Sequence, residues 1–484
     1  MKQKLLCLQK RKIFSFVASL TIFLCSCIEG YEDDPEFAPS VQNTLLNSPK
    51  AENIKIIPSA DGATVRIEWP VVHGAGGYEF TLFINDDPAN PKIVGEENEI
   101  IDGSFAIRPL LDDTNYKVSV KTLGNEKYNN KEANSPSEKE FTTLLPTYAT
   151  IPSGTDISSW FSDNPMPVDS IGTELAYVLE PGGQYTLSSP IDFGNQKVTF
   201  RGEKMNRASI TMGETSRIST SAGLKIKFIN FDCNAIGGAS STAALILLSS
   251  NPNPEIKGVG DYYIVKDPVV LQSCDITGVQ RNLIFDNKIK YCLTTLLIKD
   301  CNVKLETTQE QPVISFNQGF ANDFTVENST FWHTGIKNNN YFVQYNGSGR
   351  PTRAGFINGS VNYLNNTFYH VCYNKQWGNY NGFAGQSSVY WNMKNNIFLD
   401  SGKGEVARRF LGGRSNQPTA TFGNNSYWYE GAFPEEERKY DTAISIESDP
   451  QLLDPSNGNF TVQGQEQIAA RSGDPRWLPV LSEE

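Results

Sequence analysis

A four-residue motif that recurs seven times between residues 232 and 427 constrains the fold more than any other feature of this sequence. Each copy has a small polar residue, then Cys, Ser or Asn, then a variable residue, then an apolar residue. Successive copies are 41, 27, 28, 37, 30 and 29 residues apart, and such a period with insertions is typical of a solenoid. The copies occupy residues 232–235, 273–276, 300–303, 328–331, 365–368, 395–398 and 424–427.

The residues around the motif predict strands, because in six of the seven copies a second apolar residue stands two places before it. Stacking such units as coils of a parallel β-helix, about 4.8 Å apart, brings equivalent residues of successive copies into contact. The apolar position therefore predicts an internal aromatic stack. Its members are Phe331, Phe368, Phe398 and Tyr427.

The first two positions of the motif predict a polar bend and a buried ladder. We expect the asparagines at the first position to bond to the backbone of the next coil. They are Asn328, Asn365, Asn395 and Asn424. At the second position, Cys233, Cys274 and Cys301 are expected to share one ladder position as buried free thiols.

Residues 51–146 alternate apolar and polar residues in short runs that predict an antiparallel β-sandwich, with turns at Asp61-Gly62 and Gly76-Gly77. Trp69 closes one strand candidate, and Tyr116 opens another after Leu110. This arrangement resembles the fibronectin type III module and its tyrosine corner. The resemblance implies that Trp69 and Tyr116 belong to the core, and it implies no chemistry.

Residues 147–484 resemble pectate-lyase-like β-helices at both ends. Residues 177–187 and 197–202 are similar to the opening coils, and residues 449–452 and 473–477 to the closing segment of uncharacterised β-helix families. Those families occur in surface lipoproteins of polysaccharide-utilisation systems, often behind a fibronectin-like module. The resemblance implies an all-β chain with a sandwich followed by a right-handed parallel β-helix.

The N-terminus predicts export and lipidation. Residues 1–26 have a basic start and a short apolar run, the layout of a signal peptide. Their end resembles a lipobox, which implies that Cys27 carries the lipid. Residues 27–50 predict an acidic tether, which also resembles the surface-export signal of gut-type lipoproteins. We expect an outer-membrane protein that faces the exterior and meets the membrane only through its lipid.

Composition excludes several partners. A net charge of -12 over 484 residues argues against nucleic acid. The five cysteines that follow Cys27 do not form a disulfide framework, and the mature chain has no Cys/His cluster for zinc. Between residues 350 and 414, however, the sequence has eight basic residues and only two acidic ones, a local excess that suits an anionic ligand. The candidate ligand-binding bases are Arg350, Arg353, Lys375, Arg408 and Arg409.

The positions just after the aromatic stack supply further candidates. Trp332, Tyr369 and Trp428 follow it directly, so strand alternation points them outward, where a row of rings can stack on sugars. The alternative is that the insertion at 335–360 covers them. His333 and His370 come one residue later and should be neighbours, either as structural hydrogen-bonding groups or as part of a site.

Three functions remain open. The first is binding of an acidic polysaccharide, of the pectic kind, in concert with other outer-membrane glycan-uptake proteins, without a cofactor. The second is a polysaccharide lyase with Arg408, Arg409 or Lys375 as base and calcium near Asp400 or Glu405. The third is a structural spacer or adhesin.

Overall fold

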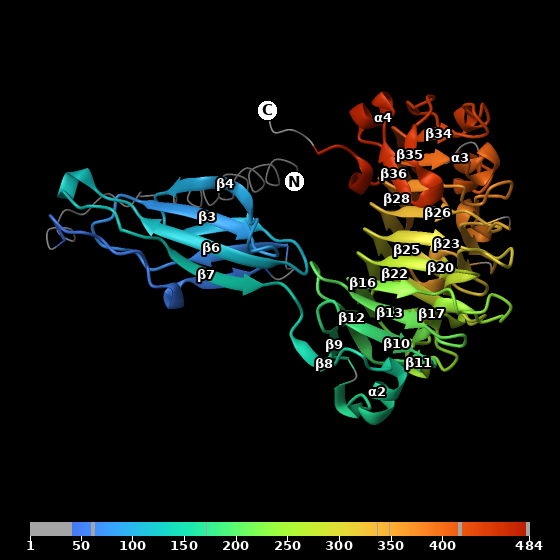
Figure 1. Cartoon of the computed structure of the whole chain (residues 1–484), viewed down its shortest axis with the longest axis horizontal. Helices are drawn as coiled ribbons and strands as arrows, with labels where there is room; N and C mark the ends of the chain where they lie inside the picture. Colours follow the sequence, from blue (N-terminus) through green and yellow to red (C-terminus); the bar gives the residue numbers. More distant parts are fainter. Residues whose placement is uncertain are drawn as a thin grey trace, which may run out of the picture. The chain divides into compact units, whose positions relative to one another are not determined.

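The computed structural model describes residues 41–59, 63–170, 172–335, 337–347, 349–414 and 419–480. The predicted signal peptide, Cys27, the tether up to residue 40 and the Asp61-Gly62 turn lie outside these residues. Among the described residues, no helix is long and apolar enough to cross a membrane. The chain divides into two compact units, Met1–Leu145 and Pro146–Glu484, which we describe separately (Figure 1).

The first unit consists of two antiparallel sheets. One has the strand order β1-β2-β5 and the other β4-β3-β6-β7. Trp69 packs between them with its ring stacked on Phe80 at 5.6 Å, and Tyr116 accepts a hydrogen bond from the backbone N–H of Leu111 at 2.7 Å. The strands are β1 (Lys55–Pro58), β2 (Thr64–Glu68), β3 (Tyr78–Ile84), β4 (Lys92–Ile101), β5 (Phe105–Pro109), β6 (Asn115–Thr122) and β7 (Ser137–Thr142).

The second unit is a parallel β-helix in which successive coils add strands to three long sheets, as the repeat predicts. Figure 1 shows these strands stacked from β10 to β34. The nine-stranded sheet carries the site described below. Its strands are β10 (Gln184–Leu187), β13 (Ala208–Met212), β16 (Ile229–Asp232), β20 (Asp275–Val279), β23 (Asn302–Leu305), β26 (Thr330–His333), β29 (Thr367–Tyr369), β32 (Ile397–Leu399) and β34 (Ser426–Trp428).

The other two sheets complete the walls of the coil. The seven-stranded sheet contains β11 (Ile191–Asp192), β14 (Ile218–Thr220), β17 (Ala244–Leu248), β21 (Asn282–Phe285), β24 (Ile314–Phe316), β27 (Val343–Tyr345) and β30 (Gly378–Asn379). The eleven-stranded sheet contains β8 (Thr147–Ile151), β9 (Glu174–Leu179), β12 (Lys197–Arg201), β15 (Leu224–Lys227), β18 (Tyr263–Val265), β19 (Val269–Gln272), β22 (Tyr291–Lys299), β25 (Phe320–Glu327), β28 (Gly359–Leu364), β31 (Val389–Lys394) and β33 (Ala420–Gly423).

The remaining elements are short helices and one hairpin; η1 and η2 belong to the first unit, and the others to the second. The hairpin of β35 (Leu452–Asp454) and β36 (Asn459–Val462) belongs to the C-terminal segment, residues 449–478. The α-helices are α2 (Ile157–Asp163), α3 (Val406–Phe410) and α4 (Gln465–Ala470). The 3₁₀ helices are η1 (Ala51–Asn53), η2 (Glu126–Tyr128), η3 (Val168–Ser170), η4 (Pro254–Ile256), η5 (Val259–Asp261), η6 (Pro351–Ala354), η7 (Asn381–Gly385), η8 (Gly402–Gly404), η9 (Glu437–Lys439), η10 (Pro455–Asn457) and η11 (Pro475–Trp477).

The aromatic stack is confirmed inside the coil. Phe331 and Phe368 stack at 5.7 Å, Phe368 and Phe398 at 5.1 Å, and Phe398 and Tyr427 at 5.5 Å. All four rings are buried. One ring per coil therefore forms a continuous column under the nine-stranded sheet.

The asparagines of the motif lie at a bend where the backbone turns left-handed. Their φ angles lie between 49° and 56°, a conformation that Asn tolerates better than most residues. The outer side chains bond to one another rather than to the backbone, since Asn395 donates to Asn365 at 3.1 Å and Asn365 to Asn328 at 3.2 Å. The second asparagines, Asn366 and Asn396, are buried and do bond to backbone carbonyls.

The prediction for the cysteines needs one correction. Cys274 and Cys301 share a ladder position, because Asp275 pairs with Asn302. Cys233 does not, because Asp275 pairs with Asn230 and the first copy of the motif is therefore out of register. All three are buried free thiols, as predicted.

Candidate functional site

An open polar groove of about 650 Å³ lies on the outer face of the nine-stranded sheet. It crosses β16, β20 and β23 and is bordered by the loop before β13 and by η11. Its lining residues are Lys204, Met205, Asn206, Arg207, Asn230, Asp275, Asn302, Arg476 and Trp477.

Strand register builds the floor of the groove. Asn230, Asp275 and Asn302 pair in sequence on three adjacent coils, so their side chains stand about 4.8 Å apart. The residue that follows each of them is apolar and buried, and this alternation turns the polar side chains outward. The floor is thus the third, variable position of the motif in the copies that begin at residues 273 and 300.

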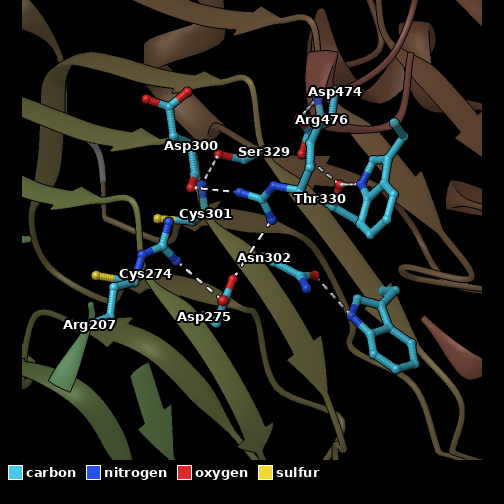
Figure 2. Close-up of polar contacts among 12 residues, drawn as sticks. Arg207, Cys274, Asp275, Asp300, Cys301, Asn302, Ser329, Thr330, Asp474 and Arg476 are labelled. Carbon is cyan, nitrogen blue, oxygen red and sulfur yellow. Dashed lines mark hydrogen bonds and ion pairs between the residues drawn. The ribbon is translucent and has the colours of Figure 1, made fainter. Parts of the chain in front are cut away.

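Two arginines from distant parts of the chain meet at Asp275 (Figure 2). Arg207 Nη1 lies 3.2 Å from Asp275 Oδ2, and Arg476 Nη1 lies 3.7 Å from Asp275 Oδ1. Arg476 also donates to the backbone carbonyl of Asp300 at 2.8 Å. This second bond fixes the guanidinium group at the edge of the groove.

The C-terminal segment, residues 449–478, packs on the strands from β26 to β34 of the same sheet face. Thr330 donates to Asp474 at 2.8 Å, and Asp474 N–H donates to Thr367 at 3.0 Å. Further along, Gln467 donates to Ser426 at 2.9 Å. The open groove therefore ends at β26, where the segment begins to cover the strands.

The charge of the groove opposes that of the whole protein. Three of its described lining side chains are basic (Lys204, Arg207 and Arg476) and one is acidic (Asp275), a balance of +2. The chain as a whole carries -12. The described lining of the groove is thus positive on a molecule that is acidic overall.

The predicted aromatic row lies on this face, but the C-terminal hairpin packs on Trp332 and Tyr369. Trp332 is only 9 % exposed, and its ring packs on Phe460 of β36 at 5.6 Å. The hydroxyl of Tyr369 shares a hydrogen bond with Ser456 at 3.3 Å, and Trp428 is half-buried. The expectation that Trp332 forms part of an open platform is therefore wrong, and the covering segment is not the insertion at 335–360.

The two histidines are neighbours at the C-terminal ends of the adjacent strands β26 and β29. His333 is fully buried, its Nδ1 accepts from the N–H of Gly335 at 2.9 Å, and burial lowers its pKa to about 4. His370 stacks on Tyr373 with the ring centres 4.3 Å apart, and burial lowers its pKa as well. Both imidazoles are therefore neutral near pH 7.

The candidate bases between residues 350 and 414 do not gather at the groove, and none of them is among its described lining residues. Arg408 and Arg409 both face Glu405, at 3.0 and 3.8 Å. Lys375 pairs with Glu310 at 2.9 Å. The other two lie elsewhere in the coil's loops, Arg350 against Gly382 and Arg353 exposed in η6.

The acids expected to hold calcium are also engaged in other contacts. Glu405 faces the two arginines of α3, and Asp400 accepts a hydrogen bond from the N–H of Glu430 at 2.7 Å. Within the described ranges, no group of three or more His, Cys, Asp or Glu side chains is placed to hold a metal ion.

The groove does not show in any local sequence pattern, because its charged residues are far apart in the chain. Arg207 and Asp275 are separated by 68 residues, and Arg476 arrives on the segment that folds back over the sheet. One signal was available. The variable position of the motif is the position that faces outward, and it holds Asp275 and Asn302.

Comparison with known proteins gives three family matches and one distant structural match. No curated protein matches the chain. The solved structure of the PL6 family alginate lyase AlyGC matches with 13% identity and a TM-score of 0.30, over 63% of this chain and 41% of the lyase. The chain thus spans less than half of that enzyme's length. Residues 1–182 match DUF4992, residues 183–334 match DUF4957 and residues 361–477 match DUF5123, each described as a domain of unknown function.

Proposed function

We propose that the β-helix unit binds an acidic polysaccharide, of the pectic kind, in the groove on the nine-stranded sheet. The observation that carries the proposal is the convergence of Arg207 and Arg476 at Asp275, on a floor that also presents the amide side chains of its strand neighbours. Guanidinium groups recognise the carboxylates of uronate sugars through paired, charge-assisted hydrogen bonds. A positive groove on a protein with a net charge of -12 favours such a ligand over a neutral one.

The remaining lining residues suit the other parts of a sugar. Asn206, Asn230 and Asn302 supply donors and acceptors for hydroxyl groups. Trp477 adds an aromatic surface at the closed end, and aromatic rings pack well on the apolar faces of sugars. Carboxylate, hydroxyl and ring face are thus each matched by a residue type in one groove.

The proposal includes the predicted anchoring. We infer a mature protein that is lipidated at Cys27 and displayed on the outer membrane beside other glycan-uptake proteins, which rests on the sequence of residues 1–50. The first unit then acts as a fibronectin type III-like spacer. Its strand order and the bond from Leu111 N–H to the Tyr116 hydroxyl support that assignment.

The test is retardation in a native gel that contains polygalacturonate or alginate, with a neutral galactan gel for comparison. We expect retardation only in the acidic gels, and less of it as salt rises. Arg207→Gln should weaken binding by about tenfold, because it removes a charged donor. Arg217→Gln is the matched control, since Arg217 carries the same charge and bonds to Thr242 outside the groove.

Three results would contradict the proposal. Equal retardation in neutral and acidic gels would show that the arginines do not select an anionic ligand. An absence of retardation in every gel would favour the spacer or adhesin. If either polyuronate yields an unsaturated product that absorbs ultraviolet light, the protein is a lyase and the binding-only proposal fails.

A further inference from the structure

Asp275 is the one acidic side chain among the described lining residues of the groove, and both arginines contact it. Each arginine approaches Asp275 through Nη1, at 3.2 Å for Arg207 and 3.7 Å for Arg476. The side chain of Asp275 is 45% exposed. Its carboxylate thus faces both the arginines and the open groove.

The fold does not demand an acid at this position. The neighbours of Asp275 in the same outward row are Asn230 and Asn302, and Ser209 and Thr330 continue the row beyond them. All four are neutral and lie on the same kind of strand. A neutral residue therefore fits the backbone and the spacing at residue 275.

The ion pairs also contribute little to stability. Half-exposed pairs of this kind gain little net free energy, because water screens the attraction and the side chains lose freedom. Asp275 does change the electrostatics of the groove, because it lowers the balance of its described lining charges from +3 to +2. An anion that enters is repelled by the same carboxylate that neutralises the arginines.

We infer that Asp275 is an internal competitor for the carboxylate of the ligand. It occupies Arg207 and Arg476 through the contacts that a uronate carboxylate would make, and a uronate must displace or share it. Asp275 thereby lowers the affinity of the groove and sets how strongly it prefers anionic sugars. This inference rests on the proposed function, because it concerns the same groove and the same ligand class.

The test compares the dissociation constants of oligogalacturonate for the full-length protein and its variants by titration calorimetry. Asp275→Asn should bind about tenfold more tightly and lose more affinity as salt rises, because the opposing charge is gone. Asp163→Asn is the matched control. Asp163 is exposed at the end of α2, outside the described lining of the groove and away from β16 to β23, so its substitution should change the dissociation constant less than about twofold.

Two further variants keep the test decisive. Asp275→Ser removes the same charge with a smaller side chain and should also tighten binding if the Asn variant does not fold. Asp275→Glu keeps the charge and should give no gain. If both neutral variants bind oligogalacturonate no more tightly than the wild type does, the inference is overturned and the proposed function stands. A wild-type protein that binds no oligogalacturonate refutes the proposed function itself.

Discussion

Trp477 donates its indole N–H to the hydroxyl of Thr330 at 2.8 Å, across 147 residues of sequence. The same hydroxyl donates to Asp474. One threonine on β26 thus receives two residues of the C-terminal segment, at the place where the groove ends. Docking of that segment and the shape of the groove depend on the same contacts.

Thr330→Val should therefore destabilise the C-terminal segment. The change keeps the volume but leaves the buried carboxylate of Asp474 and the indole N–H of Trp477 without their shared partner. We expect a loss of about 2 kcal/mol in the free energy of unfolding, measured by urea denaturation. Thr211→Val, at an exposed outward position on β13, should change it by less than about 0.5 kcal/mol. Equal effects of the two variants would contradict the docking role.

Asp474 should make stability fall as pH rises. Burial raises its pKa from 3.8 to about 6, although the charge of Arg476 opposes the shift. Between those values the folded state holds a proton that the unfolded state has lost, so the stabilisation is full below about pH 4 and is lost by about pH 6. The loss is on the order of 3 kcal/mol.

Asp474→Asn should remove that part of the pH dependence. Burial also raises the pKa of Glu437, to about 8, so the measured quantity is the difference between wild type and variant in urea denaturation across this range. A slope between about pH 4 and 6 that stays the same in the variant would show that Asp474 does not change its protonation on folding.

The buried asparagine ladder should tolerate substitution far less than the outer one. Asn396 is fully buried, donates to the carbonyls of Tyr363 and Lys394 and accepts from Asn366. Asn396→Ala leaves several of these groups unpaired and should cost about 3 kcal/mol or more. Asn395→Ala in the outer ladder should cost about 1 kcal/mol, mainly through its left-handed backbone. Similar losses in thermal or urea unfolding would contradict this ranking.

Trp332→Ala should affect stability more than binding. Its indole is buried under Phe460 and Gly458, so truncation should cost about 3 kcal/mol in urea denaturation. Tyr390→Ala, which removes a ring that is 48% exposed on β31, is the control and should cost less than about 1 kcal/mol. Retardation by polygalacturonate should fall less for Trp332→Ala than for Arg207→Gln. A larger fall would restore Trp332 as a contact for the sugar.

The coil could be predicted from the sequence wherever the motif repeats at short intervals. Phe331, Phe368 and Phe398 fall in phase because each coil places one ring under the same sheet. The motif copy that contains Cys233 is out of register with the later copies, because the chain inserts η4, η5 and β18 before the next copy. Spacing alone does not show how such an insertion shifts the register.

The groove could not be predicted from spacing at all. Asp275 is visible in the motif as an outward residue, but Arg476 reaches it only because the C-terminal segment folds back over β26 to β34. Long-range docking of this kind depends on contacts such as Trp477 with Thr330. No local pattern in the sequence specifies that pairing.

The length of the C-terminal segment also determines how much of the nine-stranded sheet is left uncovered. It lies along the face whose outward residues change from coil to coil, and the point where it stops decides how many coils remain open to a ligand. A relative with a shorter segment would expose more coils of the same sheet, and one with a longer segment would expose fewer. The length of sheet face that is left uncovered can thus change without altering the coil itself.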